Sequence, residues 1–234
     1  MTDRTLANWT PPPLPARSAI EGRYARLEPL SPAHIDGLWE AQCEDPTGAM
    51  WRYQPTGPHA VKADYAAWVH AQRILHDPVH FAVRMDDGRL GGTLSLMRIN
   101  AAVGTIETGW LTFAPRLQRT RASTEAVTLL TRWAFEAGYR RFEWKCDAAN
   151  LPSRRAAQRY GFSFEGVFRQ HGIVKGRNRD TAWFAAIDSE WPELRAAYDA
   201  WLDPSNFDAK GQQFTLLTDL TDPILAARDP ILSP

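Results

Sequence analysis

The pattern of apolar and polar residues along the chain predicts seven strands. Residues 80–85 alternate, Asp87-Gly88 forms a turn and 89–99 returns, which together are typical of a β-hairpin. A second hairpin is expected near the C-terminal end, across Lys175-Gly176-Arg177-Asn178. The remaining strands, including the two of that hairpin, are predicted at 23–30, 105–113, 141–146, 162–174 and 181–188.

Helical spacing of apolar residues accounts for the segments between these strands. Ser31-Pro32 begins a helix that runs through Cys43, with proline in its first turn. Further helices are expected at about 61–76, from Ala122 to near Gly138, at Ser153–Tyr160, and from Pro192 through Trp201. Strands and helices arranged around one sheet indicate an α+β or mixed α/β domain.

The two ends of the chain lack such patterns. Residues 1–20 are proline-rich and are interpreted as an extended N-terminal arm, followed by a domain at 21–202. Residues 203–234 form a tail with only a weak apolar run at Phe214–Leu217. No apolar run approaches the roughly 20 residues that span a bilayer, and the N-terminus has no secretion signal. No membrane association and a cytoplasmic location are therefore expected.

The charge balance argues against several classes of function. The chain has 27 Lys and Arg residues and 27 Asp and Glu residues, so its net charge is zero. It therefore lacks the overall positive charge that favours binding of nucleic acid. Arg116, Arg119 and Arg121 still form one local basic patch. Cys43 and Cys146 are too few for a disulfide framework, and the six histidines lack ligand spacing, so no metal site is expected.

Two segments carry the candidate chemistry. In GTIETGWLTFAPRLQRTRASTEA (104–126) a strand breaks into a helix, which leaves a nest of unpaired backbone N–H groups suited to a pyrophosphate. In NLPSRRAAQRYGF (150–162) a short helix closed by Gly-Phe can flank the other side of the same ligand. Together the two segments indicate coenzyme A binding and acyl transfer.

The order of elements and motifs resembles the GNAT superfamily of N-acetyltransferases, especially its RimJ/RimL-like branch. The resemblance covers roughly residues 21–202 and is carried by LQRTRASTEA, NLPSRRAAQRYGFSFEGVFRQ and GRNRDTAWFAAIDSEW. It implies a twisted, largely antiparallel sheet of about seven strands, flanked by helices and split near strands 4 and 5. It also implies acetyl-CoA as co-substrate and a primary amine acceptor, on a small molecule or a protein N-terminus.

The resemblance also implies which residues hold the coenzyme. The family loop reads Gln/Arg-x-x-Gly-x-Gly/Ala; here Arg121 stands at the first glycine and Ser123 at the last position. Strand amides near Leu111 and Phe113 are expected to pair with the pantetheine arm and to meet the oxyanion. The complete set of expected cofactor-binding residues is Leu111, Thr112, Phe113, Gln118, Arg119, Thr120, Arg121, Ala122, Ser123, Asn150 and Ser153.

Two residues are candidates for proton transfer. Glu107 is the candidate base, and a period of two places it on one strand face with Gly109, Leu111 and Phe113; the alternative is a solvent-side or hairpin-paired charge. The family often has a tyrosine seven residues after the motif asparagine, but this position is Ala157, and Tyr160 is expected to serve packing. The resemblance to RimL-like enzymes, which look to use a serine at this position, implies Ser153 as the proton donor, and its alternative role is the N-cap of its helix.

Several residues and the overall activity have alternative interpretations. Trp51, Tyr53 and Trp68 line an acceptor pocket or belong to the core. Cys146 could act as a nucleophile with His171 in a hydrolase, although a buried strand cysteine is favoured. A non-catalytic coenzyme A-binding or assembly domain is a further alternative. A homodimer through the 162–188 hairpin or the tail is possible.

Overall fold

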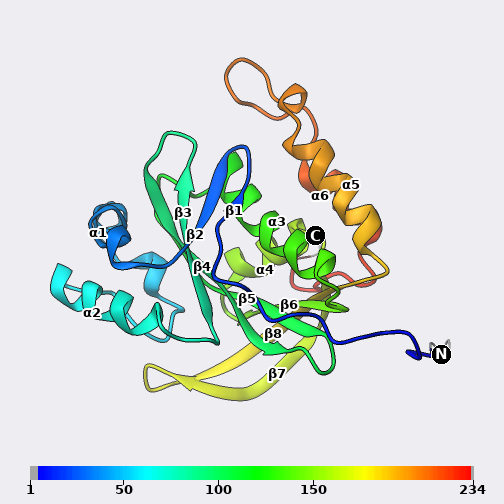
Figure 1. Cartoon of the computed structure of the whole chain (residues 1–234), viewed down its shortest axis with the longest axis horizontal. Coiled ribbons are helices and arrows are strands. Elements are labelled where there is room, and N and C mark those ends of the chain that lie inside the picture. The colour runs from blue at the N-terminus through cyan, green and yellow to red at the C-terminus, as the bar shows by residue number, and fades with distance from the viewer. Residues whose placement is uncertain (1–4, 233–234) are drawn as a thin grey trace.

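The computed structural model describes residues 5–232 of the 234-residue chain, and these residues form one sheet of eight strands. Its order is β1-β2-β3-β4-β5-β6-β8-β7 (Figure 1). The strands are β1 (Ile20–Glu21), β2 (Ala25–Pro29), β3 (Val79–Met85), β4 (Leu90–Asn100), β5 (Thr105–Phe113), β6 (Arg141–Asp147), β7 (Ser163–Val174) and β8 (Arg177–Ile187). All seven predicted strands are present, and the eighth is the two-residue β1.

Helices cover both faces of this sheet (Figure 1). The α-helices are α1 (Ile35–Cys43), α2 (Lys62–Gln72), α3 (Arg121–Glu136), α4 (Leu151–Arg159), α5 (Trp191–Leu202) and α6 (Leu217–Thr221). Short 3-10 helices occur at Pro32–His34, Ala49–Trp51, Pro204–Asn206 and Asp222–Ile224. The five predicted helices are confirmed, whereas α6 lies in the tail, where the sequence showed only a weak apolar run.

The sheet opens between β5 and β6. All its pairs are antiparallel except β5–β6, which is parallel and is paired only from Thr105–Thr108 to Arg141–Trp144. Beyond Thr108 the two strands diverge, and the second half of β5 keeps a neighbour only in β4. These are the fourth and fifth predicted strands, so the expected split is confirmed.

A bulge in β5 corrects the expected side-chain directions. Ser95 of β4 lies opposite Gly109 and Thr93 lies opposite Thr112, so one residue of β4 between these pairs faces two of β5. Trp110 takes a φ of +52° at this point. Glu107 therefore shares its face with Gly109 and Thr112. The prediction that it shares a face with Leu111 and Phe113 is wrong, because the extra residue reverses the alternation.

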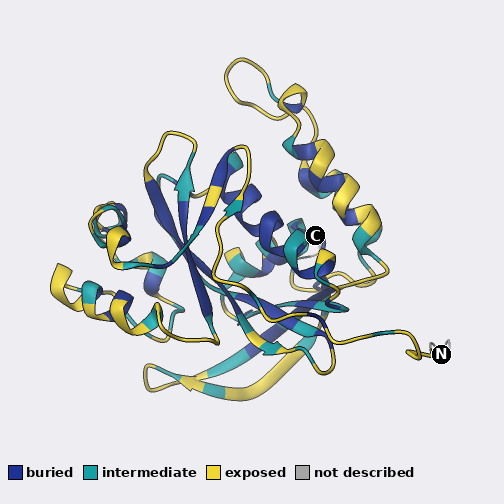
Figure 2. Ribbon diagram, viewed as in Figure 1, coloured by how far each residue is buried: buried dark blue, intermediate teal, exposed yellow. Residues whose placement is uncertain are grey.

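Two hydrophobic clusters hold the layers together. Buried residues lie mainly along the strands of the sheet and on α3 (Figure 2). The larger lies between the sheet and α3, and it contains the fully buried Ile106, Leu130 and Phe142. The smaller lies against α1 and α2, and it contains Trp51 and Trp68. Helix α3 belongs to the larger cluster because its apolar residues recur at helical spacing, and it ends before Gly138, whose φ of +98° suits a helix C-terminus.

The C-terminal tail packs back onto the sheet. The backbone N–H of Phe164 donates to Ala227 O at 3.0 Å, and Thr221 Oγ1 donates to Arg159 O at 3.0 Å. Arg154 of α4 and Asp229 form a two-pronged ion pair, with both contacts at 2.5 Å, and both residues are buried. The tail is therefore tied to α4 and to the start of β7.

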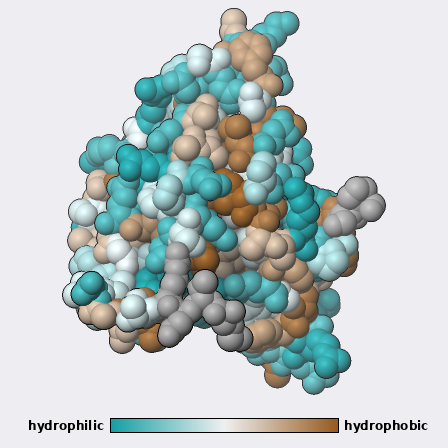
Figure 3. Space-filling model, turned by 90° about the vertical axis from the view of Figure 1, so that its right-hand side faces the viewer, coloured by the Kyte–Doolittle hydropathy of each residue, from teal (hydrophilic) through white to brown (hydrophobic). Residues whose placement is uncertain are grey.

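The other end of the chain runs along the surface. Residues 5–19 form neither helix nor strand, and the first four residues of the predicted arm lie outside the described residues. Tyr139 Oη donates to Pro13 O at 3.0 Å, which ties the arm to the end of α3. On the face shown in Figure 3, hydrophobic residues lie in small groups between hydrophilic ones. Within residues 5–232, no helix combines the length and apolarity needed to cross a membrane.

The buried pair between α4 and the tail generates a stability prediction. Replacing Asp229 by Asn leaves the buried Arg154 guanidinium without its counter-charge, which costs roughly 3 kcal/mol of unfolding free energy. Urea denaturation of both proteins measures this difference. The control is Asp36→Asn, which removes the exposed ion pair with Lys62 and is expected to change stability far less. Equal losses in the two variants would contradict this account of the tail.

Candidate active site

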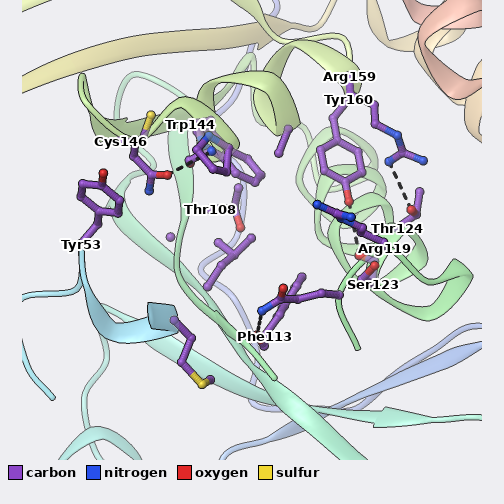
Figure 4. A pocket seen from close by; sticks show the side chains of 18 of the residues that line it. Tyr53, Thr108, Phe113, Arg119, Ser123, Thr124, Trp144, Cys146, Arg159 and Tyr160 are labelled. Carbon is purple, nitrogen blue, oxygen red and sulfur yellow. Dashed lines mark hydrogen bonds between the residues drawn. The ribbon is translucent and has the colours of Figure 1, made fainter. Parts of the chain in front are cut away.

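The cleft opened by the divergence of β5 and β6 has a volume of about 1400 Å³ (Figure 4). Its walls come from β5, β6, the first turn of α3, helix α4, the loop between α1 and α2, and the segment after α5. The predicted site residues that line it are Tyr53, Glu107, Leu111, Phe113, Gln118, Arg119, Thr120, Arg121, Ser123, Asn150 and Ser153. The structure thus brings the two sequence motifs together around one space.

Four of the predicted site residues lie elsewhere. Thr112 is buried on the opposite face of β5 from Leu111, where its hydroxyl lies 2.7 Å from Thr93 Oγ1. The side chain of Ala122, in the first turn of α3, is buried in the larger core cluster, so only its backbone remains a candidate for the site. Trp51 and Trp68 are 2% and 7% exposed, and their rings meet edge to face in the smaller core cluster.

The first turn of α3 presents unpaired main-chain donors. Thr120 caps the helix: its Oγ1 accepts from the Ser123 N–H at 3.1 Å, and its own N–H donates to Ser123 Oγ at 3.2 Å. Among the described residues, no acceptor meets the N–H groups of Arg119, Arg121 and Ala122. These donors and the positive end of the helix dipole suit a diphosphate.

The missing glycines do not distort this turn. Arg121 is the first residue of α3 and has ordinary helical geometry, so its backbone conformation does not require glycine. The left-handed residue is Arg119, with a φ of +61°. The guanidinium of Arg121 lies between the rings of Tyr24 and Phe207, at 4.7 and 4.8 Å from their centroids. The side chain that replaces glycine is thus held by two aromatic rings.

The open edge of β5 offers a second set of main-chain groups. The Ala114 N–H donates to Gly91 O, toward β4, at 2.9 Å. Because backbone N–H and C=O groups alternate in direction along a strand, those of Leu111 and Phe113 point away from β4, toward the cleft. Their carbonyls accept from Gln54 Nε2 at 2.8 Å and from Gln118 Nε2 at 2.7 Å. An extended chain that carries amides can pair with this edge as an added strand.

Glu107 is a buried carboxylate in contact with two cations. Its side chain is 2% exposed, and it meets Arg98 Nη1 at 2.6 Å and Lys145 Nζ at 3.1 Å. Burial raises the pKa of Glu107 above its ordinary value, and the two cations oppose that rise. Lys145 also meets Glu143 at 2.6 Å and lies 3.8 Å above the Trp183 ring. Glu107 is therefore not a solvent-side charge; its contact with Arg98 of β4 is the hairpin pairing that was the other alternative, and Lys145 of β6 adds a second cation.

Ser153 lies across the cleft in the first turn of α4. The N-cap of this helix is Asn150, whose Oδ1 accepts from the Ser153 N–H at 3.2 Å, so the interpretation of Ser153 as N-cap is wrong. Ser153 Oγ accepts from Trp144 Nε1 at 3.0 Å. This contact uses an acceptor position of the hydroxyl, and the Ser153 side chain also hydrogen-bonds Cys146.

Three further side chains with candidate roles, Cys146, His171 and Tyr160, have other surroundings. Burial raises the pKa of the Cys146 thiol to about 11, and His171 hydrogen-bonds Thr181 Oγ1 at 3.0 Å. The ring of Tyr160 stacks on Trp144 with centroids 5.9 Å apart, and its hydroxyl lies 3.4 Å from Ser123 O (Figure 4). Its surroundings are those of a core residue at the edge of the cleft.

Sequence reasoning missed several residues on the cleft walls. Lys145 follows Glu143 at the period of two in β6, so strand alternation does place the two charges on one face. Arg159, Trp201, Phe207 and Gln213 carry no such signal, because they reach the cleft only through the packing of α4, α5 and the tail. Among residues 5–232, no group of three or more His, Cys, Asp or Glu side chains has metal-binding geometry.

Comparison with known proteins identifies the family to which the chain belongs. Residues 25–163, more than half of the chain, match the family described as "Acetyltransferase (GNAT) domain". No curated protein sequence matches the chain.

Solved structures agree with that family. A GCN5-related N-acetyltransferase from Brucella melitensis is 47% identical with a TM-score of 0.90, and the match covers 92% of this chain and 99% of that one. A probable acetyltransferase of the GNAT family from Chromobacterium violaceum is 38% identical with a TM-score of 0.76, covering 82% and 97%. The RimL alpha-N-protein acetyltransferase in complex with coenzyme A, at 20% identity, a TM-score of 0.62 and coverage of 73% and 99%, shares the fold. The chain belongs to the GNAT family of acetyltransferases.

Proposed function

We propose that this acetyltransferase moves the acetyl group of acetyl-CoA directly to a primary amine, carried by a small molecule or by a protein N-terminus. One observation carries the proposal: the unpaired donors at the start of α3 border the same cleft as Glu107 and Ser153. A diphosphate at α3 directs the rest of the coenzyme along the open edge of β5. The reacting thioester then reaches the part of the cleft between Glu107 and Ser153.

The main chain supplies the binding and much of the orientation in this proposal. The N–H groups of Arg119, Arg121 and Ala122 would hold the diphosphate, and the β5 edge at Leu111 and Phe113 would pair with the pantetheine amides. The side-chain amides of Gln54 and Gln118 occupy carbonyls of that edge and would give way to the arm. Binding energy from the nucleotide end thereby positions the thioester for attack.

The reaction forms a bond between the amine nitrogen and the acetyl carbon and breaks the bond from that carbon to sulfur. An α-amine has a pKa of about 8 and a lysine amine about 10.4, so the acceptor must lose a proton. Glu107 would take this proton through a water molecule, since the carboxylate is almost fully buried. No acyl-enzyme forms.

The other charges of the reaction have partners on the cleft walls. The main-chain N–H groups of β5 near Leu111 would stabilise the oxyanion of the tetrahedral intermediate. Ser153 would hydrogen-bond the leaving sulfur and pass it a proton, which solvent then replaces. The contact from Trp144 supports this role because it fixes the Ser153 oxygen and does not use the hydroxyl proton, which would turn from Cys146 to the leaving sulfur.

A non-catalytic coenzyme A-binding domain is the second candidate, and one observation favours it. Glu107 contacts both Arg98 and Lys145, and a carboxylate held by two cations is a weaker base than a free one. Burial acts in the opposite direction and raises the pKa of Glu107. Turnover therefore decides between the two candidates, whereas binding alone does not.

The first experiment incubates the protein with acetyl-CoA and a panel of primary amines and follows the release of free thiol. We expect thiol release that depends on an amine, and a loss of about 100-fold or more in kcat for Glu107→Gln, since general bases contribute that much. Glu165→Gln, on an exposed part of β7, is the matched control and should retain full activity. Calorimetry that detects no coenzyme A binding would refute the proposal, and tight binding without turnover on any amine would favour the second candidate.

The raised pKa of Glu107 generates a prediction about pH. The base works only when ionised, so kcat should fall as the pH decreases through a value above the ordinary carboxyl pKa of 4.5. Measuring kcat with two saturating amines whose own pKa values differ by more than one unit separates this group from the substrate. The fall in kcat at low pH should have the same midpoint for both amines and should be absent in Glu107→Gln. A midpoint that shifts with the pKa of the amine would show that Glu107 is not the base.

The thiol of Cys146 gives a test against the hydrolase alternative. With its pKa raised to about 11, only about one thiol in a thousand is ionised at pH 8. A thiol reagent should therefore modify the exposed Cys43 quickly and Cys146 slowly. Cys146→Ala is expected to keep its thiol-release rate with amines. Loss of that rate in a variant with an unchanged melting temperature would restore Cys146 as a nucleophile.

A further inference from the structure

One end of the cleft is built by a part of the chain beyond the matched family domain. That domain ends at residue 163, yet Trp201 at the end of α5 and Phe207 and Gln213 after it line the cleft. This segment follows α5, and its Phe207 meets Arg121 in the first turn of α3. It therefore adds a wall on the α3 side, away from Glu107.

Aromatic rings on this wall hold two arginines. Arg121 lies between Tyr24 and Phe207, and Arg159 lies 5.0 Å from the centroid of the Trp201 ring. Arg159 Nη1 also donates to Thr124 Oγ1 at 3.2 Å, so the guanidinium stands beside the first turn of α3 (Figure 4). Both side chains line the cleft. Stacked guanidiniums keep a fixed orientation and retain free N–H groups.

Neither arginine has a carboxylate partner within residues 5–232. Elsewhere in the chain arginines are commonly paired, as Arg116 is with Glu40 and Glu44. The nearest acid along α3, Glu125, is turned away and accepts from three backbone N–H groups at the start of β2. This wall therefore carries two fixed, uncompensated positive charges in a chain of zero net charge. An anionic ligand would supply the counter-charge that both guanidiniums lack.

The segment itself is held in one conformation. Trp201 Nε1 donates to Gln213 Oε1 at 2.7 Å, and the Trp201 and Phe207 rings meet edge to face at 5.2 Å. Phe207 and Gln213 form an antiparallel bridge. The rings that hold the arginines are thus cross-linked to each other, which fixes the spacing between the two guanidiniums.

We propose that Arg121 and Arg159 form a subsite for the 3′-phosphate of the coenzyme, with Phe207 and Trp201 as positioning residues. This inference rests on the proposed function, in which the main-chain donors of α3 take the diphosphate. Coenzyme A carries a second, separate anion on its ribose, and the guanidinium fork matches a phosphate in charge and geometry. The C-terminal segment thereby makes this enzyme selective for the 3′-phosphorylated coenzyme.

The test compares coenzyme A with 3′-dephospho-coenzyme A by calorimetry. The wild-type protein should bind coenzyme A more tightly, and Arg159→Gln should weaken that binding about tenfold, as expected for loss of one charge-assisted contact. The same variant should leave binding of dephospho-coenzyme A unchanged. Arg155→Gln is the matched control, because Arg155 is exposed on the same helix one turn earlier and does not line the cleft. It should bind both compounds as the wild type does.

A second variant separates positioning from folding. Phe207→Ala removes one of the two rings that hold Arg121, and it should reduce the preference for coenzyme A over dephospho-coenzyme A, whereas partial unfolding would weaken binding of both compounds equally. Equal binding of the two compounds by the wild type, or an equal loss of both in Arg159→Gln, would overturn the subsite and leave the proposed function intact. Binding of neither compound by the wild type would instead refute the proposed function.

Discussion

The divergence of β5 from β6 after four paired residues is the constraint on which the site depends. A strand that leaves its neighbour keeps unpaired N–H and C=O groups, and these cost free energy unless they find partners. In this protein the carbonyls of Leu111 and Phe113 take the side-chain amides of Gln54 and Gln118. The cleft therefore follows from the sheet itself, and its main-chain groups are already oriented toward an incoming chain.

Charge is distributed unevenly along this cleft. At one end the carboxylate of Glu107 is buried with Arg98 and Lys145, so burial and ion pairing act on its pKa in opposite directions. At the other end the guanidiniums of Arg121 and Arg159 rest on aromatic rings without carboxylates among the described residues. One end thus holds balanced charge suited to proton transfer, and the other holds positive charge suited to phosphates.

Helix α3 illustrates how a glycine-poor loop keeps the same main-chain donors. Glycine is required only where φ is positive or where another chain approaches closely. In this protein Arg119 is the residue with the positive φ, and the side chains of Thr120 and Ser123 cap the helix. The Arg121 side chain packs on the rings of Tyr24 and Phe207. A departure from the family motif is thereby accommodated by contacts from Tyr24, just before β2, and from the segment after α5.

The sequence by itself determined the strands, the five main helices and the two motifs, because periodicity, turns and capping are local properties. The split of the sheet was expected only from the resemblance to a family. Tertiary structure decided the bulge at Trp110 that reverses the faces of β5, the burial of Trp51 and Trp68, and the pairing of Glu107 with Lys145. It also decided that Phe207 meets Arg121. These features depend on which distant segments pack together, and no spacing along the chain encodes that contact.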